Sequence, residues 1–242
     1  MDTLQAIRTR RSIRDYLDVP VEWEKIGLVL DAGRLAPSAG NTQEWNFIVV
    51  TDGEVRQQIA ESCVDGLWMA KAPVFIVITA NIEPISRNYG IRGERLYSIQ
   101  DCAVAATQMM LAAHVQGLGT CWVGSFDEHL LGRLLSLPDT ARPQVILTLG
   151  YPDEHPPMPL RKRLEAIVFL NSFGNRIRDI GFVLRDYNVA GKAVEAGRGA
   201  VSSLQKKASE KREKARLSLK EQLKAKRDAL KAALAKKGKK KA

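Results

Sequence analysis

The spacing of apolar positions predicts alternating helices and strands along the first 170 residues. Apolar residues recur at helical spacing in 22–35, which predicts an amphipathic helix that ends before Pro37. The run PVFIVITA at 73–80 has no polar face and is rich in β-branched residues, as is typical of a strand covered on both sides. The other predicted elements are a short helix capped by Asp2, helices at 54–63, 92–115 and 128–137, and strands at 46–51, 121–124, 144–149 and 166–170. Together they predict an α+β sheet with helices on its faces.

The composition changes beyond Gly191, and the charge changes with it. The whole chain has 37 Lys and Arg against 27 Asp and Glu, a net charge of +10. Residues 195–242 hold 17 Lys and Arg against 5 Asp and Glu, so they carry +12 and residues 1–194 carry −2. We therefore expect three parts: a domain at 1–175, an arm at 176–194 that is too apolar to be a free tail, and a Lys-rich helical or disordered tail at 195–242.

The rest of the composition limits the function classes. The three cysteines, Cys63, Cys102 and Cys121, are widely spaced without a CxxC pair, so neither a disulfide framework nor a zinc site is predicted. No apolar run approaches the roughly 20 residues of a membrane-spanning helix, and the N-terminus lacks the apolar stretch of a signal peptide. We expect a protein of the cytoplasm, with no metal site.

Four segments carry candidate chemistry, and the first is the run RRSIR at 10–14. It places Arg10, Arg11, Ser12 and Arg14 within five residues, where the first helix ends. A guanidinium group grips a phosphate through two hydrogen bonds, and a cation beside the pyrimidine edge of a flavin stabilises the anionic reduced form. A solvated basic face is the alternative interpretation of this segment taken alone.

The second segment is the polar loop at 36–47, between a helix and the first strand of the core. Pro37 ends the helix, while Ser38 and Asn41 offer donors and acceptors that suit the edge of a heterocycle. A turn with its own internal hydrogen bonds is the alternative interpretation.

The third and fourth segments lie further along the chain. In GLGTCWVGSF at 117–126 the glycines allow close approach to a planar ring, and a backbone N–H of Val123 or Gly124 is placed to meet a flavin's reactive nitrogen. The spacing is not GxGxxG, so it does not indicate a nicotinamide Rossmann site. Arg161 and Arg163 follow a proline-rich stretch and are expected to complete a phosphate site.

In this order and over this length, the four segments resemble the nitroreductase family of FMN enzymes. The resemblance covers residues 2 to about 175 and is most specific in RRSIR, in APSAGNTQEWNFIVV at 36–50, in residues 93–126 and in LGYP at 149–152. It implies a mixed, mainly antiparallel central sheet flanked by helices. It also implies a homodimer with two FMN sites across the interface.

The resemblance also implies a role for each candidate site residue. Arg10, Arg11, Ser12 and Arg14 would bind the phosphate, ribityl and pyrimidine parts of FMN, and Arg161 with Arg163 would hold the phosphate. Pro37, Ser38 and Asn41 would cover the ring from the neighbouring subunit. Val123 and Gly124 would approach N5. No protein nucleophile is expected, because the flavin carries the redox chemistry.

The function expected from this resemblance is two-electron transfer from NAD(P)H to a small acceptor, such as a nitroaromatic or a quinone, by a ping-pong mechanism. Two alternatives stay open. The basic tail at 195–242 suits a protein that binds nucleic acid or an anionic surface without sequence preference. A dehalogenase or a flavin-modifying enzyme of the same superfamily shares the first motif.

Overall fold

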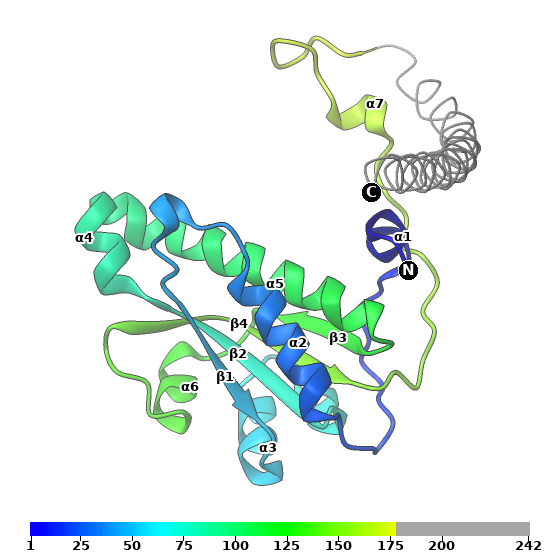
Figure 1. The fold of residues 1–242 in the computed structure, drawn as a ribbon, viewed down its shortest axis with the longest axis vertical. Coiled ribbons are helices and arrows are strands. Elements are labelled where there is room, and N and C mark those ends of the chain that lie inside the picture. The colour runs from blue at the N-terminus through cyan, green and yellow to red at the C-terminus, as the bar shows by residue number, and fades with distance from the viewer. Residues whose placement is uncertain (178–242) are drawn as a thin grey trace, which may run out of the picture. The chain divides into compact units, whose positions relative to one another are not determined.

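A four-stranded sheet forms the centre of the first of two compact units. The computed structural model describes residues 1–177; the first unit is Met1–Pro159 and the second begins at Leu160. The sheet order is β1-β2-β4-β3, and every neighbouring pair is antiparallel (Figure 1). Its strands are β1 (Trp45–Val50), β2 (Val74–Asn81), β3 (Gly119–Val123) and β4 (Ala141–Gly150). The predicted α+β class is confirmed, and among the described residues the sheet is antiparallel throughout.

Strand β2 shows why the sheet needs helices on both faces. It is the run that the sequence predicted as doubly covered, and its side chains are buried along nearly all of its length. Because side chains alternate along a strand, Val74, Ile76 and Ile78 join one core while Phe75 and Val77 join the other.

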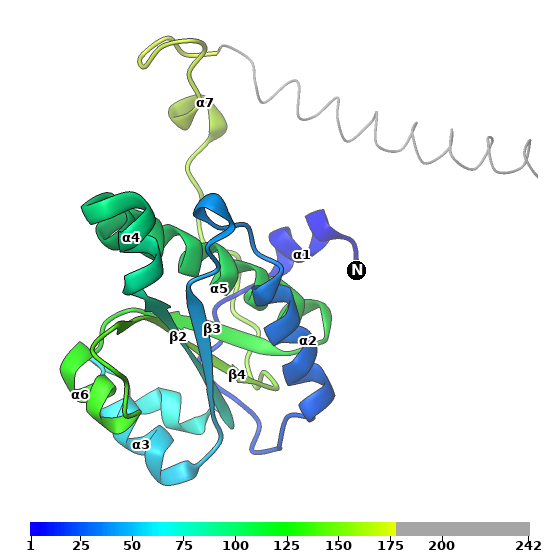
Figure 2. The same cartoon turned by 60° about the vertical axis from the view of Figure 1, so that its left-hand side comes forward.

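Helices cover the two faces. α2 (Trp23–Arg34) and α5 (Ser98–Val115) pack on one face, while α3 (Gly53–Glu61) and α6 (Glu128–Leu134) lie on the other (Figures 1 and 2). α2 and α5 cross closely at Gly33, where an added Cβ would lie 2.2 Å from Cε of Met109. The remaining helices are α1 (Thr3–Thr9), α4 (Ile82–Arg92), α7 (Leu164–Ile167) and the single turns η1 (Ala39–Asn41), η2 (Leu67–Lys71) and η3 (Gly93–Tyr97).

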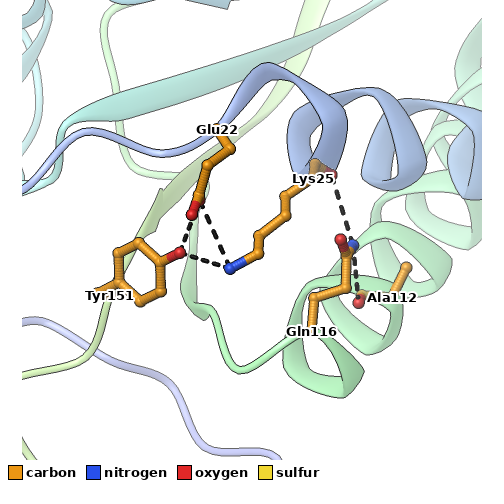
Figure 3. Close-up of polar contacts among 5 residues, drawn as sticks. All are labelled: Glu22, Lys25, Ala112, Gln116 and Tyr151. Carbon is orange, nitrogen blue, oxygen red and sulfur yellow. Dashed lines mark hydrogen bonds and ion pairs between the residues drawn. The ribbon is translucent and has the colours of Figure 1, made fainter.

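A polar cluster ties the start of α2 to the end of β4 (Figure 3). The Tyr151 hydroxyl accepts a hydrogen bond from Nζ of Lys25 at 2.5 Å and donates one to Oε2 of Glu22 at 2.6 Å. The Lys25 ammonium also lies 4.7 Å from the centre of the Tyr151 ring. This contact lowers the pKa of Glu22 and raises that of Lys25, because the hydroxyl hydrogen-bonds to both charged groups. Gln116 of the segment after α5 joins the cluster by donating to the carbonyl of Lys25 at 3.4 Å.

Several predicted elements are confirmed, two are wrong, and one helix was not predicted. Asp2 caps α1 as predicted, since its carboxylate accepts from the backbone N–H of Gln5 at 2.8 Å. The long helix predicted at 92–115 instead consists of η3, a single π-helical turn, followed by α5, and α4 was not predicted. Gly90 breaks α4 with φ 57° and ψ −147°, a conformation that only glycine adopts readily.

The strand predicted at 166–170 is the second error. Its first two residues instead end α7, which the sequence LEAI forms at 164–167 because Leu, Glu and Ala favour helix. Phe169 makes only an isolated bridge with Arg176. The arm from residue 178 onward and the whole tail at 195–242 lie outside the described residues. Within residues 1–177, no helix is long and apolar enough to cross a membrane.

Candidate functional site

The arginine segment at 10–14 runs beside the first residues of β3. Ser12 forms a parallel bridge with Thr120, and the backbone N–H of Ile13 donates to the carbonyl of Thr120 at 3.0 Å. An added Cβ at Gly119 would lie 2.8 Å from the Ile13 side chain, so this close approach requires glycine. Two segments that are more than 100 residues apart in the sequence, both singled out for chemistry, are therefore neighbours in the fold.

Arg11 has a guanidinium group that its surroundings satisfy only in part. Its Nη1 donates to the backbone carbonyls of Arg8 at 2.9 Å and Arg10 at 2.8 Å. Its Nε is buried and has no acceptor among the residues that the structure describes. A buried charged donor without an acceptor is costly, so this nitrogen suits an anionic ligand.

A pocket of about 370 Å³ lies against this segment. Arg10, Arg11 and Ile13 line one side, and residues 117–120 line another. His114 also lines the pocket; its Nε2 lies 2.7 Å from the Thr9 hydroxyl. Burial, followed by the charges of Arg10 and Arg11, lowers the pKa of His114. Glu154 lines the pocket as well, but its carboxylate accepts from the backbone of Arg14 and Asp15. Arg10 and Arg11 are the guanidinium groups in the lining, and they suit an anion such as a phosphate.

Residues at the end of β4 and after it hold the backbone of the arginine segment by hydrogen bonds. Oε1 of Glu154 accepts hydrogen bonds from the backbone N–H groups of Arg14 at 2.5 Å and Asp15 at 3.2 Å. The buried Tyr16 hydroxyl donates to the carbonyl of Ile13 and meets the Thr148 hydroxyl at 2.6 Å. Burial raises the pKa of Tyr16, so this phenol stays protonated as a donor. Neither Glu154 nor Tyr16 was singled out from the sequence, although both flank motifs that were.

Arg14 points in a different direction from Arg11. It is exposed, and its guanidinium carbon lies 5.7 Å from the centre of the Trp68 ring in η2. This contact holds a cation beside an aromatic face without burying it. The position leaves Arg14 accessible to a ligand.

The loop at 36–44 contains three residues with a left-handed backbone conformation. Gly40, Asn41 and Gln43 have φ of 55°, 57° and 52°, which glycine and asparagine tolerate best. Ser38 Oγ accepts from the backbone N–H of Gln43 at 3.0 Å. Pro37 and Asn41 are exposed, so both predicted ligand contacts are accessible.

The loop is held by helices α4 and α5. The backbone N–H of Ala39 donates to Oδ2 of Asp101 at 2.8 Å. An added Cβ at Gly40 would lie 2.2 Å from the Tyr89 hydroxyl, so Tyr89 packs directly on the turn. Tyr89 also makes an edge contact with Tyr97, with 5.3 Å between ring centres.

The two predicted FMN-binding segments contact opposite ends of α5. Asp101 near its start contacts the loop, whereas His114 near its end contacts α1 (Figure 1). Thirteen residues of helix separate them, which is about 20 Å at 1.5 Å per residue. In one chain, the contacts of the loop and of the end of α1 with α5 are therefore about 20 Å apart.

The remaining predicted site residues lie in two places. Val123 is the last residue of β3, and Gly124 follows it in an exposed turn. Arg161 and Arg163 belong to the second unit, where both are exposed and Arg163 pairs with Glu165 at 3.5 Å. Their predicted phosphate contact stays a prediction. Met69 of η2 is fully buried in the core.

Comparison with known proteins assigns the family. The nitroreductase family matches residues 7–68 and 64–151, a span that holds the arginine segment, the loop and β3. The chain belongs to the nitroreductase family. The predicted enzyme class, an oxidoreductase of this kind, is confirmed.

Individual relatives agree with this family. A protein of Methanothermobacter thermautotrophicus, provisionally named an NADH dehydrogenase/NAD(P)H nitroreductase, is 39% identical over 160 residues, which cover 64% of this chain and 80% of the relative. The FMN reductase [NAD(P)H] of Bacillus subtilis is 26% identical over an alignment that covers 72% of this chain and 76% of the relative. The structure of an FMN-dependent nitroreductase from Clostridium difficile covers 71% of this chain and all of its own, with 29% identity and a TM-score of 0.61.

Proposed function

We propose that this nitroreductase-family protein is an FMN-dependent oxidoreductase that transfers two electrons from NAD(P)H to a small acceptor. The proposed acceptors are nitroaromatics, quinones and similar molecules, and the proposed kinetics are ping-pong. The names of the relatives as FMN reductases and nitroreductases support this class. The observation that carries the proposal in this chain is the buried Nε of Arg11, which has no acceptor within residues 1–177 and lies beside a pocket that suits a phosphate.

The residues present fit FMN. Arg10 and Arg11 line the pocket and supply charged donors for its phosphate, while Ser12 is held beside Thr120 at the start of β3. Arg161 and Arg163 are proposed to reach the same phosphate. Val123 and Gly124 offer backbone N–H groups at the end of β3, and a backbone donor there suits the N5 side of the ring.

When bound, FMN supplies the two-electron chemistry that the protein's own side chains lack. This chain positions it and sets its electrostatics. Arg14 keeps a fixed orientation through its contact with Trp68 and remains accessible, so it is the residue that we assign to stabilise negative charge on the reduced cofactor. Tyr16 and Glu154 hold the backbone of the segment at fixed points during this change of charge.

We also propose that the protein is a homodimer in which Pro37, Ser38 and Asn41 of one subunit cover the flavin of the other. The separation of about 20 Å along α5 supports it, because the loop and the arginine segment then serve two different sites. Large apolar side chains on α1 and α2 support it as well: Leu4, Ile7, Trp23 and Leu28 are each at least 55% exposed. Sedimentation should give a dimer at micromolar concentration, and a flavin-loaded monomer would contradict the shared site.

The direct test is to identify the cofactor released from the purified protein. FMN in a ratio of one per chain is expected, followed by turnover of NADH or NADPH with a nitroaromatic or quinone and parallel lines in double-reciprocal plots. The double variant Arg10→Ala/Arg163→Ala should lose the flavin, because each charge-assisted contact to phosphate contributes about 1.5–3 kcal/mol. Full retention of flavin would overturn the phosphate assignment.

The chemistry of the product separates this function from its superfamily alternatives. An oxidoreductase returns its FMN intact after many turnovers, whereas a flavin-modifying enzyme consumes it. A dehalogenase would release halide from a halogenated aromatic substrate. We place the enzyme in the cytoplasm, which is supported by cysteines that are all free and buried in the structure.

A further inference from the structure

Glu44 is a buried carboxylate at the point where the loop at 36–44 enters β1. Its exposed fraction is 3%, and neither of its carboxylate oxygens has a hydrogen-bond donor among the described residues. Its backbone carbonyl accepts from Asn81 at 2.7 Å, so the residue cannot swing out without breaking the start of the strand. An ionised carboxylate in this position would have no compensation for its lost hydration.

The neighbour that Glu44 does have is a second acid. Asp101 is 8% exposed, and its Oδ2 accepts from the backbone N–H of Ala39 in the loop. Through Ala39, Asp101 contacts the same loop that Glu44 ends, and its charge is one of the causes that raise the pKa of Glu44. Two carboxyl groups hydrogen-bond to each other only when one of them carries a proton. Asp101 thus joins the loop to α5 through Ala39, and Glu44 is the buried acid at the end of the same loop.

Within the part of the chain that the structure describes, no ion pair includes Glu44 or Asp101. The buried thiol of Cys102 in α5 is a further titratable group on which both carboxyl groups act. Burial, and then the charge of Asp101, raise the pKa of Glu44 to about 7. The same two carboxyl groups raise the pKa of the Cys102 thiol further, after burial, so the thiol stays neutral.

We propose that Glu44 and Asp101 share one proton, and that this proton fastens the loop at 36–44 to α5 in the position that covers a flavin. Glu44 is in this view a positioning residue that acts through Ala39 and the loop backbone. The part of the inference that concerns flavin rests on the proposed function. The shared proton itself rests only on the two carboxyl groups.

The sign of the pH dependence follows from the proton count. Between the ordinary pKa of a glutamate and about 7, the folded chain holds a proton that the unfolded chain has lost. The free energy of unfolding therefore falls as the pH rises through this window and levels off above it. Above about pH 7 the two carboxylates repel each other, which weakens the hold of α5 on the loop even though the Ala39 N–H can still donate to Asp101.

The first experiment measures the dissociation constant of FMN between pH 6 and pH 8.5 for the wild-type protein and for Glu44→Gln. If only the protonated pair holds the loop in place, the wild-type constant should rise about tenfold for each pH unit above 7. Glu44→Gln should show no such rise, because its amide donates to Asp101 at every pH. The ratio of the two constants cancels the titration of the FMN phosphate itself. A constant ratio would overturn the proposed role in flavin binding.

A second variant keeps the test possible if the Glu44→Gln protein does not fold. In Asp101→Asn, the NH2 group of the new amide can donate to Glu44 when Glu44 is ionised, and the amide oxygen can accept from Glu44 when Glu44 is protonated. The rise in the FMN dissociation constant with pH should therefore be much smaller than in the wild type. A rise equal to that of the wild type would count against a shared proton.

The last readout needs no flavin. At pH 6 the infrared spectrum of the wild-type protein should contain a protonated carboxyl band that is absent from Glu44→Gln and that disappears as the pH is raised through 7. If the protein binds no FMN but shows this band, the proposed function fails and the shared proton stands. If the band is missing while FMN binds, the inference fails and the proposed function stands.

Discussion

At the scale of single residues, Arg11 has one guanidinium nitrogen that is fully used and one that is not. Nη1 serves two backbone carbonyls, which fix the side chain, while the buried Nε has no acceptor among the described residues. The side chain is therefore held in place before any ligand arrives, which reduces the entropic cost of binding. Its neighbour Arg14 instead lies over Trp68 and stays exposed.

Replacing Arg11 should weaken FMN binding more than replacing a surface arginine. Arg11→Ala should raise the dissociation constant by roughly 10- to 100-fold, the equivalent of one charge-assisted hydrogen bond of about 1.5–3 kcal/mol. Arg11→Lys keeps the charge but loses the planar fork, so it should recover only part of this loss. Fluorescence titration of FMN measures the constant, with Arg133→Ala in α6 as the matched control. Equal affinities for Arg11→Ala and Arg133→Ala would show that Arg11 does not contact the cofactor.

Glu154 should affect the stability of the fold, because its carboxylate accepts hydrogen bonds from the backbone of the arginine segment. Glu154→Ala removes the acceptor of the Arg14 and Asp15 N–H groups, so the melting temperature of the flavin-free protein should fall by several degrees. Glu154→Gln keeps an acceptor oxygen and should lose less. Asp153→Ala changes the adjacent exposed carboxylate and is the control for charge alone. An unchanged melting temperature in Glu154→Ala would mean that the segment is held by Tyr16 and Thr120 without it.

At this scale the sequence predicted the candidate hydrogen-bond donors of the site better than the residues that hold those donors in place. Arg10, Arg11, Ser12 and Arg14 stand together in a short run, so their proximity needs no fold to be seen. Glu154 contacts the backbone of Arg14 across 140 residues, and the pairing of β3 with β4 helps to bring the two segments together. Glu44 was included in the quoted loop but not singled out, because its burial depends on α5.

At the scale of elements, the cluster of Glu22, Lys25 and Tyr151 joins α2 to the end of β4. This matters for the site because α2 leads into the loop at 36–44 and the segment after β4 contains Glu154. The cluster (Figure 3) thus connects α2, which leads into the loop at 36–44, to the segment after β4, which holds the arginine segment. Its side chains are partly exposed, so salt should screen part of the interaction.

Removing the Tyr151 hydroxyl tests this connection. Tyr151→Phe keeps the ring under the Lys25 ammonium but removes both hydrogen bonds, so the melting temperature at pH 7 should fall by about 1–4 °C. The lowered pKa of Glu22 means that its share of this stability is lost as the pH falls through that pKa; the difference between wild type and variant should therefore shrink in acid. Thermal unfolding at pH 7 and pH 3, with and without 1 M salt, measures it. A difference that grows in acid would contradict the assignment.

The elements were predicted best where the pattern is strongest. The run at 73–80 gave β2 nearly residue for residue, because a strand buried on both faces tolerates only apolar side chains. The long helix was placed but its start was not, since nothing in the periodicity distinguishes the π-helical turn η3 from α-helix. α7 was mistaken for a strand because four residues are too few to show a period.

At the scale of the whole molecule, charge separates the body from the tail. Residues 1–194 carry −2 and residues 195–242 carry +12. The family match covers only the body, with its last matched residue at 151. We propose that the tail adds contacts with nucleic acid or an anionic surface to an enzyme that works without it.

A chain that ends at Val194 tests this division. It should keep its FMN, its dimeric state and its turnover with NAD(P)H, because the proposed site residues all precede residue 164. It should lose any salt-sensitive binding to double-stranded DNA or anionic vesicles, since a body with net negative charge has little with which to displace counterions. Flavin content, sedimentation and filter binding at 50 and 200 mM salt give the three readouts. Loss of flavin on truncation would show that the tail belongs to the enzyme.

The bridge between Ser12 and Thr120 has a consequence for the protein's behaviour in concentrated solution. β3 is an outer strand of the sheet, and an outer strand offers unpaired N–H and C=O groups to any passing chain. The arginine segment occupies part of that edge. Clipping of the first fourteen residues by a protease would therefore uncover a β-edge as well as remove ligand contacts, and the damaged enzyme would aggregate instead of persisting as a soluble, inactive protein.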